Sequence, residues 1–247
     1  MKQPSRNVAP KSAQSGFTLV EIAIVLVIIG LLLGGILKGQ EMITQAKIKN
    51  LINDFNGLGA AIYSYQDRYR ALPGDESNAN TVARWGANAF GGNGNGLFYR
   101  TAQLATDTYN NIPAAAPSAT TPESNLFWMH LRLSGFVGGS TDTTIAASTL
   151  PPANSVNGIV GVQTSGMGFS SNIICTSNLP DKVAIAVDTQ VDDGSSIRGQ
   201  VRGQLQTTPN EAASATSPTM EYAETGRSEE HTSELQSLAY LVCRLLL

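Results

Sequence analysis

The chain has few of the residues that carry catalytic chemistry. Its 247 residues include two histidines and two cysteines, and charged residues make up only 14%. We find no Ser/His/Asp or Cys/His set, no metal-ligand spacing and no defensible pair of catalytic carboxylates. His130 stands beside Trp128 and Leu131 with no second ligand nearby, and such a histidine usually packs in a core. We therefore predict that the protein is not an enzyme.

Positive charge is equally scarce. Lys and Arg number 16 against 19 Asp and Glu, a net charge of −3, and no basic patch stands out, so no nucleic acid is predicted as a partner. The glycine cluster at residues 91–96 is followed by no Lys-Ser or Lys-Thr, and it lacks the strand and helix that flank a phosphate-binding loop. We predict no nucleotide and no cofactor, apart from the calcium alternative considered below.

One long apolar run dominates the N-terminal region. Residues 17–37 form 21 positions with a single ionisable residue, Glu21, and as a helix they would cover roughly 30 Å, the thickness of a bilayer core. The preceding segment carries Lys2, Arg6 and Lys11 and no acid, which places the N-terminus in the cytoplasm. A secretory signal peptide needs a small-residue site after its apolar region, and residues 39–41 form a poor one. The run is therefore predicted to be an anchor that crosses the membrane once.

Glu21 is the exceptional residue of this run. A carboxylate inside the apolar core of a membrane costs several kcal/mol unless it is paired or neutralised, so such residues are usually functional. A Glu that is merely tolerated near the interface is the alternative, and we favour the functional interpretation.

The residues around Glu21 supply a function for it. Gly16-Phe17-Thr18-Leu19-Val20-Glu21 resembles the processing site of type IV prepilins and type II secretion pseudopilins. The resemblance implies that a prepilin peptidase cuts between Gly16 and Phe17, that Phe17 is then N-methylated, and that Glu21 guides assembly. Cleavage would create a positive amine on Phe17, with which Glu21 of a neighbouring subunit can pair where water is absent.

The same resemblance implies a structural role and a location. The protein would wait in the bacterial inner membrane and then polymerise into a cell-surface pilus or a periplasmic pseudopilus. Its partners would be other pilin or pseudopilin subunits, the prepilin peptidase and methyltransferase, and an inner-membrane assembly platform. The helix-breaking proline of many major pilins is missing, which leaves pilus and pseudopilus open. A minor pilin with an adhesive or DNA-binding tip, and a membrane-anchored exported binding module or enzyme, are the alternatives.

The apolar run continues into an amphipathic segment at residues 38–70. Apolar residues recur there at steps of three and four, which predicts a helix with one buried face. Pro73 and Gly74 are expected to end it. Residues 17–70 would thus form one helix of about 80 Å, the spine of a pilin-like head. The residues of the apolar stripe are Ile48, Leu51, Ile52, Phe55, Leu58, Ile62, Tyr65 and Tyr69.

Residues 71–226 are predicted to form the globular head, after a cleaved leader at 1–16. A second short helix should begin at Thr121-Pro122-Glu123 and end near Gly135. Residues 72–96 are expected to be a long ordered loop. Short β-branched or alternating runs predict strands at 158–162, 173–176, 183–191 and 197–201. The fold class is therefore α+β, with the long helix packed on a small antiparallel sheet.

Two groups of oxygen-bearing side chains are candidates for calcium, which some pseudopilins bind in the head. Asp75, Asn78 and Asn80 form one group, and Asp188, Asp192 and Asp193 form the other. Neither fits the spacing of a known calcium loop. Asp and Asn also fill turns for local hydrogen-bonding reasons, which is the interpretation we favour.

The last 21 residues, 227–247, resemble the translation of a sequencing-library adapter. Two constant blocks, residues 227–237 and 241–247, flank three residues that fit a short index. We treat this segment as an artefact and leave it out of the fold prediction. Cys175 is then alone, and the family often closes a C-terminal loop with a disulfide. We expect that its natural partner lies in sequence that the segment replaces, and a bridge from Cys175 to Cys243 would be fortuitous.

Overall fold

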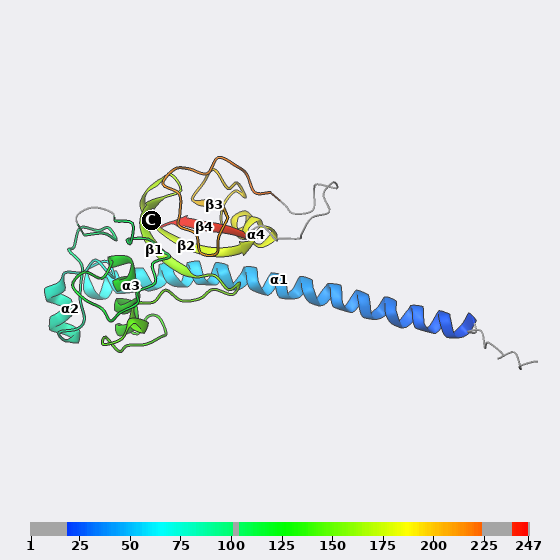
Figure 1. Ribbon diagram of the computed structural model, residues 1–247, viewed down its shortest axis with the longest axis horizontal. Coiled ribbons are helices and arrows are strands. Elements are labelled where there is room, and N and C mark those ends of the chain that lie inside the picture. Colours follow the sequence, from blue (N-terminus) through cyan, green and yellow to red (C-terminus); the bar gives the residue numbers. More distant parts are fainter. Residues whose placement is uncertain (1–18, 101–103, 224–238, 247) are drawn as a thin grey trace, which may run out of the picture. The chain divides into compact units, whose positions relative to one another are not determined.

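The computed structural model describes residues 19–100, 104–223 and 239–246 (Figure 1). The chain divides into two compact units, residues 1–44 and residues 45–247. Helix α1, Leu19–Tyr69, has 51 residues and runs through the boundary between them. Its described beginning and its end agree with the helix predicted at 17–70. Gly16 and Phe17, the predicted cleavage and methylation positions, lie outside the described residues.

In the first unit, α1 is apolar on every side. All of its residues from Leu19 to Lys38 are exposed, so this segment buries nothing within the described chain. By length and composition α1 is able to cross a membrane. A helix that is hydrophobic all round needs lipid or other helices as its surroundings.

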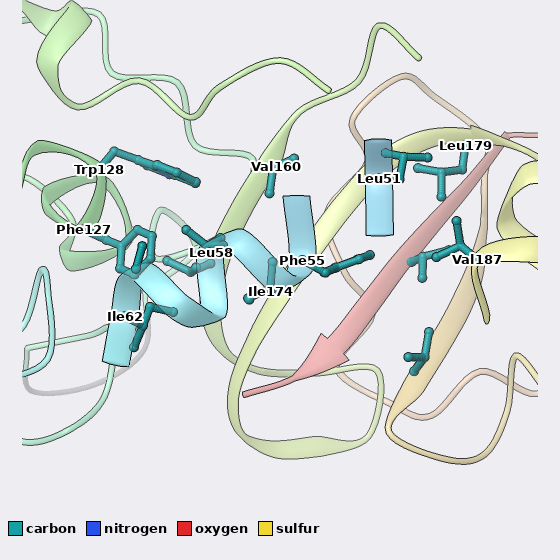
Figure 2. Packing of buried hydrophobic residues seen from close by; sticks show 14 of the residues in the cluster. Leu51, Phe55, Leu58, Ile62, Phe127, Trp128, Val160, Ile174, Leu179 and Val187 are labelled. Carbon is teal, nitrogen blue, oxygen red and sulfur yellow. The ribbon is translucent and has the colours of Figure 1, made fainter. Parts of the chain in front are cut away.

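In the second unit, one face of α1 enters the core. Every third or fourth residue is buried, as the apolar stripe predicts, and the stripe packs against the sheet and two further helices. Figure 2 shows Leu51 of α1 beside Leu179 of the sheet, Phe55 and Leu58 near Ile174, and Ile62 beside Phe127. After Tyr69 the backbone of Arg70 turns to a positive φ of 57°, and Pro73 and Gly74 follow as the predicted end.

The sheet has four strands in the order β1-β2-β4-β3, and all neighbours are antiparallel. The strands are β1 (Val160–Gly166), β2 (Phe169–Pro180), β3 (Val201–Gln206) and β4 (Ala239–Leu245). The α+β prediction is confirmed. The strands predicted at 158–162 and 173–176 fall largely on β1 and β2, whereas the one predicted at 197–201 touches β3 only at Val201.

Residues 183–191 are helical, so the strand predicted there is wrong. They belong to α4, Asp181–Val191, which follows β2 directly. Val183, Ala184 and Val187 are buried on one face of this helix. The prediction instead followed the alternation of the β-branched residues Val183, Ile185 and Val187, which is also typical of a strand. Asp181 and the preceding Pro180 supply a helix start that the β-branched residues outweighed in the prediction.

Two further helices and one short turn complete the second unit. α3, Glu123–Leu133, confirms the predicted second helix. α2, Asn78–Trp85, lies in the segment predicted to be a loop, and its eight residues are too few to show a helical period. A 3₁₀ turn, η1, covers Ala146–Ser148.

Residues 239–245, which lie in the segment left out of the fold prediction, form strand β4. β4 lies between β2 and β3 and pairs with both (Figure 1), and Cys243 stands opposite Cys175 and forms a disulfide with it. Tyr240, Leu241 and Val242 are buried. This placement has a physical reason that is independent of the segment's origin, because a short β-branched and apolar run forms a strand wherever a sheet offers two open edges.

Candidate functional site

Glu21 lies in the first turn of α1, where the positive end of the helix dipole stabilises a carboxylate. Its neighbours Val20, Ile22 and Ile24 are exposed apolar residues. The sequence of the apolar run thus presents one acidic side chain on an otherwise apolar helix surface. Such a carboxylate is suited to pair with a cation in an apolar environment, since the attraction between charges is strongest there.

Glycines leave the same segment open to close approach. A Cβ added to Gly30, Gly34 or Gly35 would meet no heavy atom within 4 Å. Small residues at such positions allow the backbones of neighbouring membrane helices to come near each other. The surface of the apolar segment is therefore compatible with a bundle of helices as well as with lipid.

His130 is packed, as its sequence context predicts. It is fully buried on α3, and its ring lies between the Gly74 amide, which donates to Nδ1 at 2.9 Å, and the Phe90 carbonyl, 2.9 Å from Nε2. Burial lowers the pKa of His130 to about 4, so the ring is neutral near pH 7. Through these two contacts, His130 holds Gly74 and Phe90, which follow α1 in the chain, against α3.

Asp75, Asn78 and Asn80, the first calcium candidates, lie just after α1. The Asp75 carboxylate accepts the amides of Gly94, Asn95 and Gly96, and the Asn78 side chain accepts the amide of Gly91. These bonds hold the glycine-rich segment in place. The bonded residues are 13 to 21 positions apart in the chain, so these are tertiary contacts and not the local turn bonds that the sequence favoured.

The second candidates do come together. Ligand atoms of Asp188, Asp192 and Asp193 all lie within 4.8 Å of one another. Each carboxylate also accepts a backbone amide: Gly194 donates to Asp188, Ser195 to Asp193, and Val201 to Asp192. Burial raises the pKa of Asp188 to about 6, and the charges of the other two add to this rise. The three carboxylates thus lie close enough together to bind a cation, and each is also hydrogen-bonded to the backbone as in a turn.

Two buried carboxylates were not foreseen from the sequence. Glu76 accepts the Tyr65 hydroxyl at 2.5 Å and both terminal nitrogens of Arg84 at 2.8 and 2.7 Å, which ties α2 to α1. Glu123 is completely buried at the start of α3. No sequence signal marks either, since an exposed acid in a loop or a first helical turn has the same local pattern.

Comparison with known proteins gives one match. The family described as the prokaryotic N-terminal methylation motif matches residues 11–37. No curated protein and no solved structure matches the chain. The match covers the basic flank, the predicted cleavage site and the apolar run with Glu21. On this motif the chain is recognised as type IV prepilin-like or pseudopilin-like.

Proposed function

We propose that this protein is the precursor of a structural subunit of a type IV pilus or a type II secretion pseudopilus. A prepilin peptidase cuts it between Gly16 and Phe17, Phe17 is N-methylated, and the mature subunit polymerises through α1. Before assembly it is held in the inner membrane with its N-terminus in the cytoplasm. The match of residues 11–37 to the methylation motif is the observation that carries this proposal.

The helix adds physical support. The apolar part of α1 buries nothing of its own chain, so it needs lipid in the stored subunit and other helices in a polymer. Cleavage gives Phe17 a free amine, with which Glu21 of a neighbouring copy can pair. Pairing the amine of one copy with the carboxylate of the next would set the stagger between neighbouring helices.

Mass spectrometry of the N-terminus tests the processing step. The chain is produced in a bacterium with a prepilin peptidase, and the expected N-terminus is N-methylated Phe17. Production without the peptidase is the control, in which the leader should remain. An intact leader in the presence of the peptidase, or a cut at another bond, would contradict the proposal.

Glu21→Ala tests the assembly step. We expect normal cleavage but at least about tenfold less polymer, because an unpaired charge in an apolar interface costs roughly 3 kcal/mol or more. Polymer recovered by shearing is measured beside the mature N-terminus of the same cells. Ile22→Ala, a neighbouring change that leaves the charge intact, is the matched control. Incorporation of Glu21→Ala at the wild-type level would remove the role assigned to Glu21.

A further inference from the structure

An apolar groove lies beside α1 in the second unit. It has a volume of about 330 Å³, and α1 contributes Asp54, Gly57 and Leu58 to its lining. Trp128 of α3 and Val160 of β1 form apolar walls; Figure 2 shows both side chains with Leu58. A Cβ added to Gly57 would meet nothing within 4 Å, so the backbone itself is open there. The groove therefore offers apolar contact to a long side chain that carries a polar end.

Among the described residues, Asp54 is the one charged residue that lines this groove. Within the same part of the chain its carboxylate has no hydrogen-bonding or ionic partner. Asp54 is exposed at the rim of the groove, so a cation can reach its carboxylate from outside. A cation with an apolar stem could therefore contact both the carboxylate and the apolar walls.

The chain carries suitable cations on the same helix. Lys47 and Lys49 precede Asp54, and the side chains of both have no ionic partner in the described part of the chain. Seven residues turn a helix by nearly two full turns, so Lys47 faces the same side as Asp54. Five residues rotate the helix by about 140°, so Lys49 and Asp54 face different sides of α1. When two copies lie parallel and side by side, Lys49 of one copy can therefore face Asp54 of the other.

The spacing also agrees with the pairing proposed at the membrane end. From Phe17 to Glu21 the acid follows the base by four residues, about 6 Å along a helix, and from Lys49 to Asp54 it follows by five, about 7.5 Å. A polymer repeats one operation for every subunit. A shift along the helix axis that brings the Phe17 amine next to Glu21 of the neighbouring copy would therefore also bring Lys49 next to Asp54, to within the reach of a lysine side chain.

We propose that the Asp54 groove is an assembly contact, into which a second copy of this chain inserts the side chain of Lys49. The lysine stem covers the apolar walls, and its ammonium group pairs with the Asp54 carboxylate. This inference rests on the proposed function, because it requires that the mature subunits polymerise in parallel. It adds a charge pair in the second unit to the pair at Phe17 and Glu21.

Charge reversal in the full-length chain tests the contact. Asp54→Lys and Lys49→Glu should each reduce the polymer recovered by shearing about tenfold, because each sets like charges against each other. The double variant should recover to within about twofold of wild type. Asp67→Lys, an exposed acid on the same helix, and Lys47→Glu combined with Asp54→Lys are the controls. The first should polymerise normally, and the second should not recover.

Cysteine cross-linking gives a second readout that does not depend on the reversed variants folding. In polymer that carries both Lys49→Cys and Asp54→Cys, a short bis-maleimide, which adds to two thiols, should produce a ladder of oligomers, and the pair Asp67→Cys with Asp54→Cys should not. Normal polymer from Asp54→Lys, or no ladder from wild-type amounts of polymer, would overturn the contact alone. A wild-type chain that is processed but never polymerises would overturn the proposed function and this inference with it.

Discussion

Glu123 is completely buried at the start of α3, and only one of its carboxylate oxygens has a hydrogen-bonding partner among the described residues. The Asn93 amide donates to Oε1 at 3.1 Å, while Oε2 has none. Burial raises the pKa of Glu123 to about 7, and the nearby Asp75 adds to the rise. The folded protein therefore holds a proton that the unfolded chain releases near pH 4.5.

This difference predicts a pH dependence of stability. Because the folded pKa is above the unfolded one, the contribution of Glu123 is fully present below about pH 4.5 and is lost as the pH rises to about 7. The loss is of the order of 3 kcal/mol. In Glu123→Gln the slope of the unfolding temperature against pH should be flatter between pH 5 and about 7, since an amide does not titrate.

Thermal unfolding of the full chain in detergent micelles measures this slope. Asp67→Asn is the control, because the Asp67 side chain is 83% exposed and, among the described residues, its only ion pair is one of 3.6 Å with Arg70. An identical slope in wild type and Glu123→Gln would show that Glu123 is already ionised in the folded state at pH 5.

Glu21 and Glu123 differ in how well the sequence alone predicts their roles. Glu21 is conspicuous because no other residue of its run is ionisable, and the motif around it indicates the class of function. Glu123 looks like an ordinary acid in the first turn of a helix, where the helix dipole favours it. Its burial comes from loops far along the chain, such as Asn93, and local pattern contains no information about such contacts.

At the scale of the element, the long helix was predictable and the segments that cover the sheet were less so. The apolar residues of α1 recur every three or four positions over many turns, and a strand or a loop does not produce such a pattern. In α4, Val183, Ile185 and Val187 are β-branched residues at alternate positions, which suits a strand as well as a helix, and only tertiary packing decides between the two. The glycine-rich segment after α2 is fixed by Asp75 and Asn78, whose side-chain bonds replace any regular period.

β4 gives a direct test of which residues build the sheet. It pairs with β2 and β3 over most of its length and buries Tyr240, Leu241, Val242 and Cys243. Burial of each such side chain contributes roughly 1.5–3 kcal/mol, and the disulfide to Cys175 contributes about 4 kcal/mol more. Deletion of residues 227–247 should therefore destabilise the second unit by an amount comparable to its whole net stability.

The deletion is compared with the full chain by thermal unfolding and by the reactivity of Cys175. We expect no cooperative transition, and a Cys175 thiol that reacts with an alkylating reagent. Cys243→Ser, which leaves the strand and removes only the disulfide, is the matched control and should retain a transition at a lower temperature. An unchanged transition after deletion would show that residues 227–247 are foreign to the fold, as their resemblance to an adapter suggests.

The turn after α4 gives a prediction about calcium. Asp188 accepts the Tyr222 hydroxyl at 2.8 Å as well as the Gly194 amide, Asp193 accepts the Ser195 amide, and Asp192 accepts the Val201 amide of β3. Because these bonds already compensate the carboxylates, we expect calcium chloride and a chelator to give the same unfolding temperature. A calcium-dependent rise that Asp192→Asn abolishes, and that Asp142→Asn does not, would instead establish a calcium site at these three residues.

At the scale of the whole molecule, the two units have different roles in the proposed polymerising subunit. The first unit supplies an apolar helical segment, residues 19–37, whose one carboxylate is Glu21, and it has no core of its own among the described residues. The second unit contains both clusters of buried apolar residues. Stability and membrane attachment are therefore predicted to be separable properties of the chain.

A fragment of residues 45–247 tests this separation. It retains all seven buried residues of α1, from Ile48 to Tyr65, so it should be soluble, and its unfolding temperature should lie within about 4 °C of the full chain's second unit. The full chain should stay with the membrane pellet after alkaline extraction, since its apolar helix needs lipid. A fragment of residues 71–247 is the control. It loses large core side chains worth about 2–5 kcal/mol each, more in total than a domain's net stability, and should not fold. If 45–247 aggregates while the full chain is folded in micelles, the apolar helix is needed for the fold as well as for the membrane.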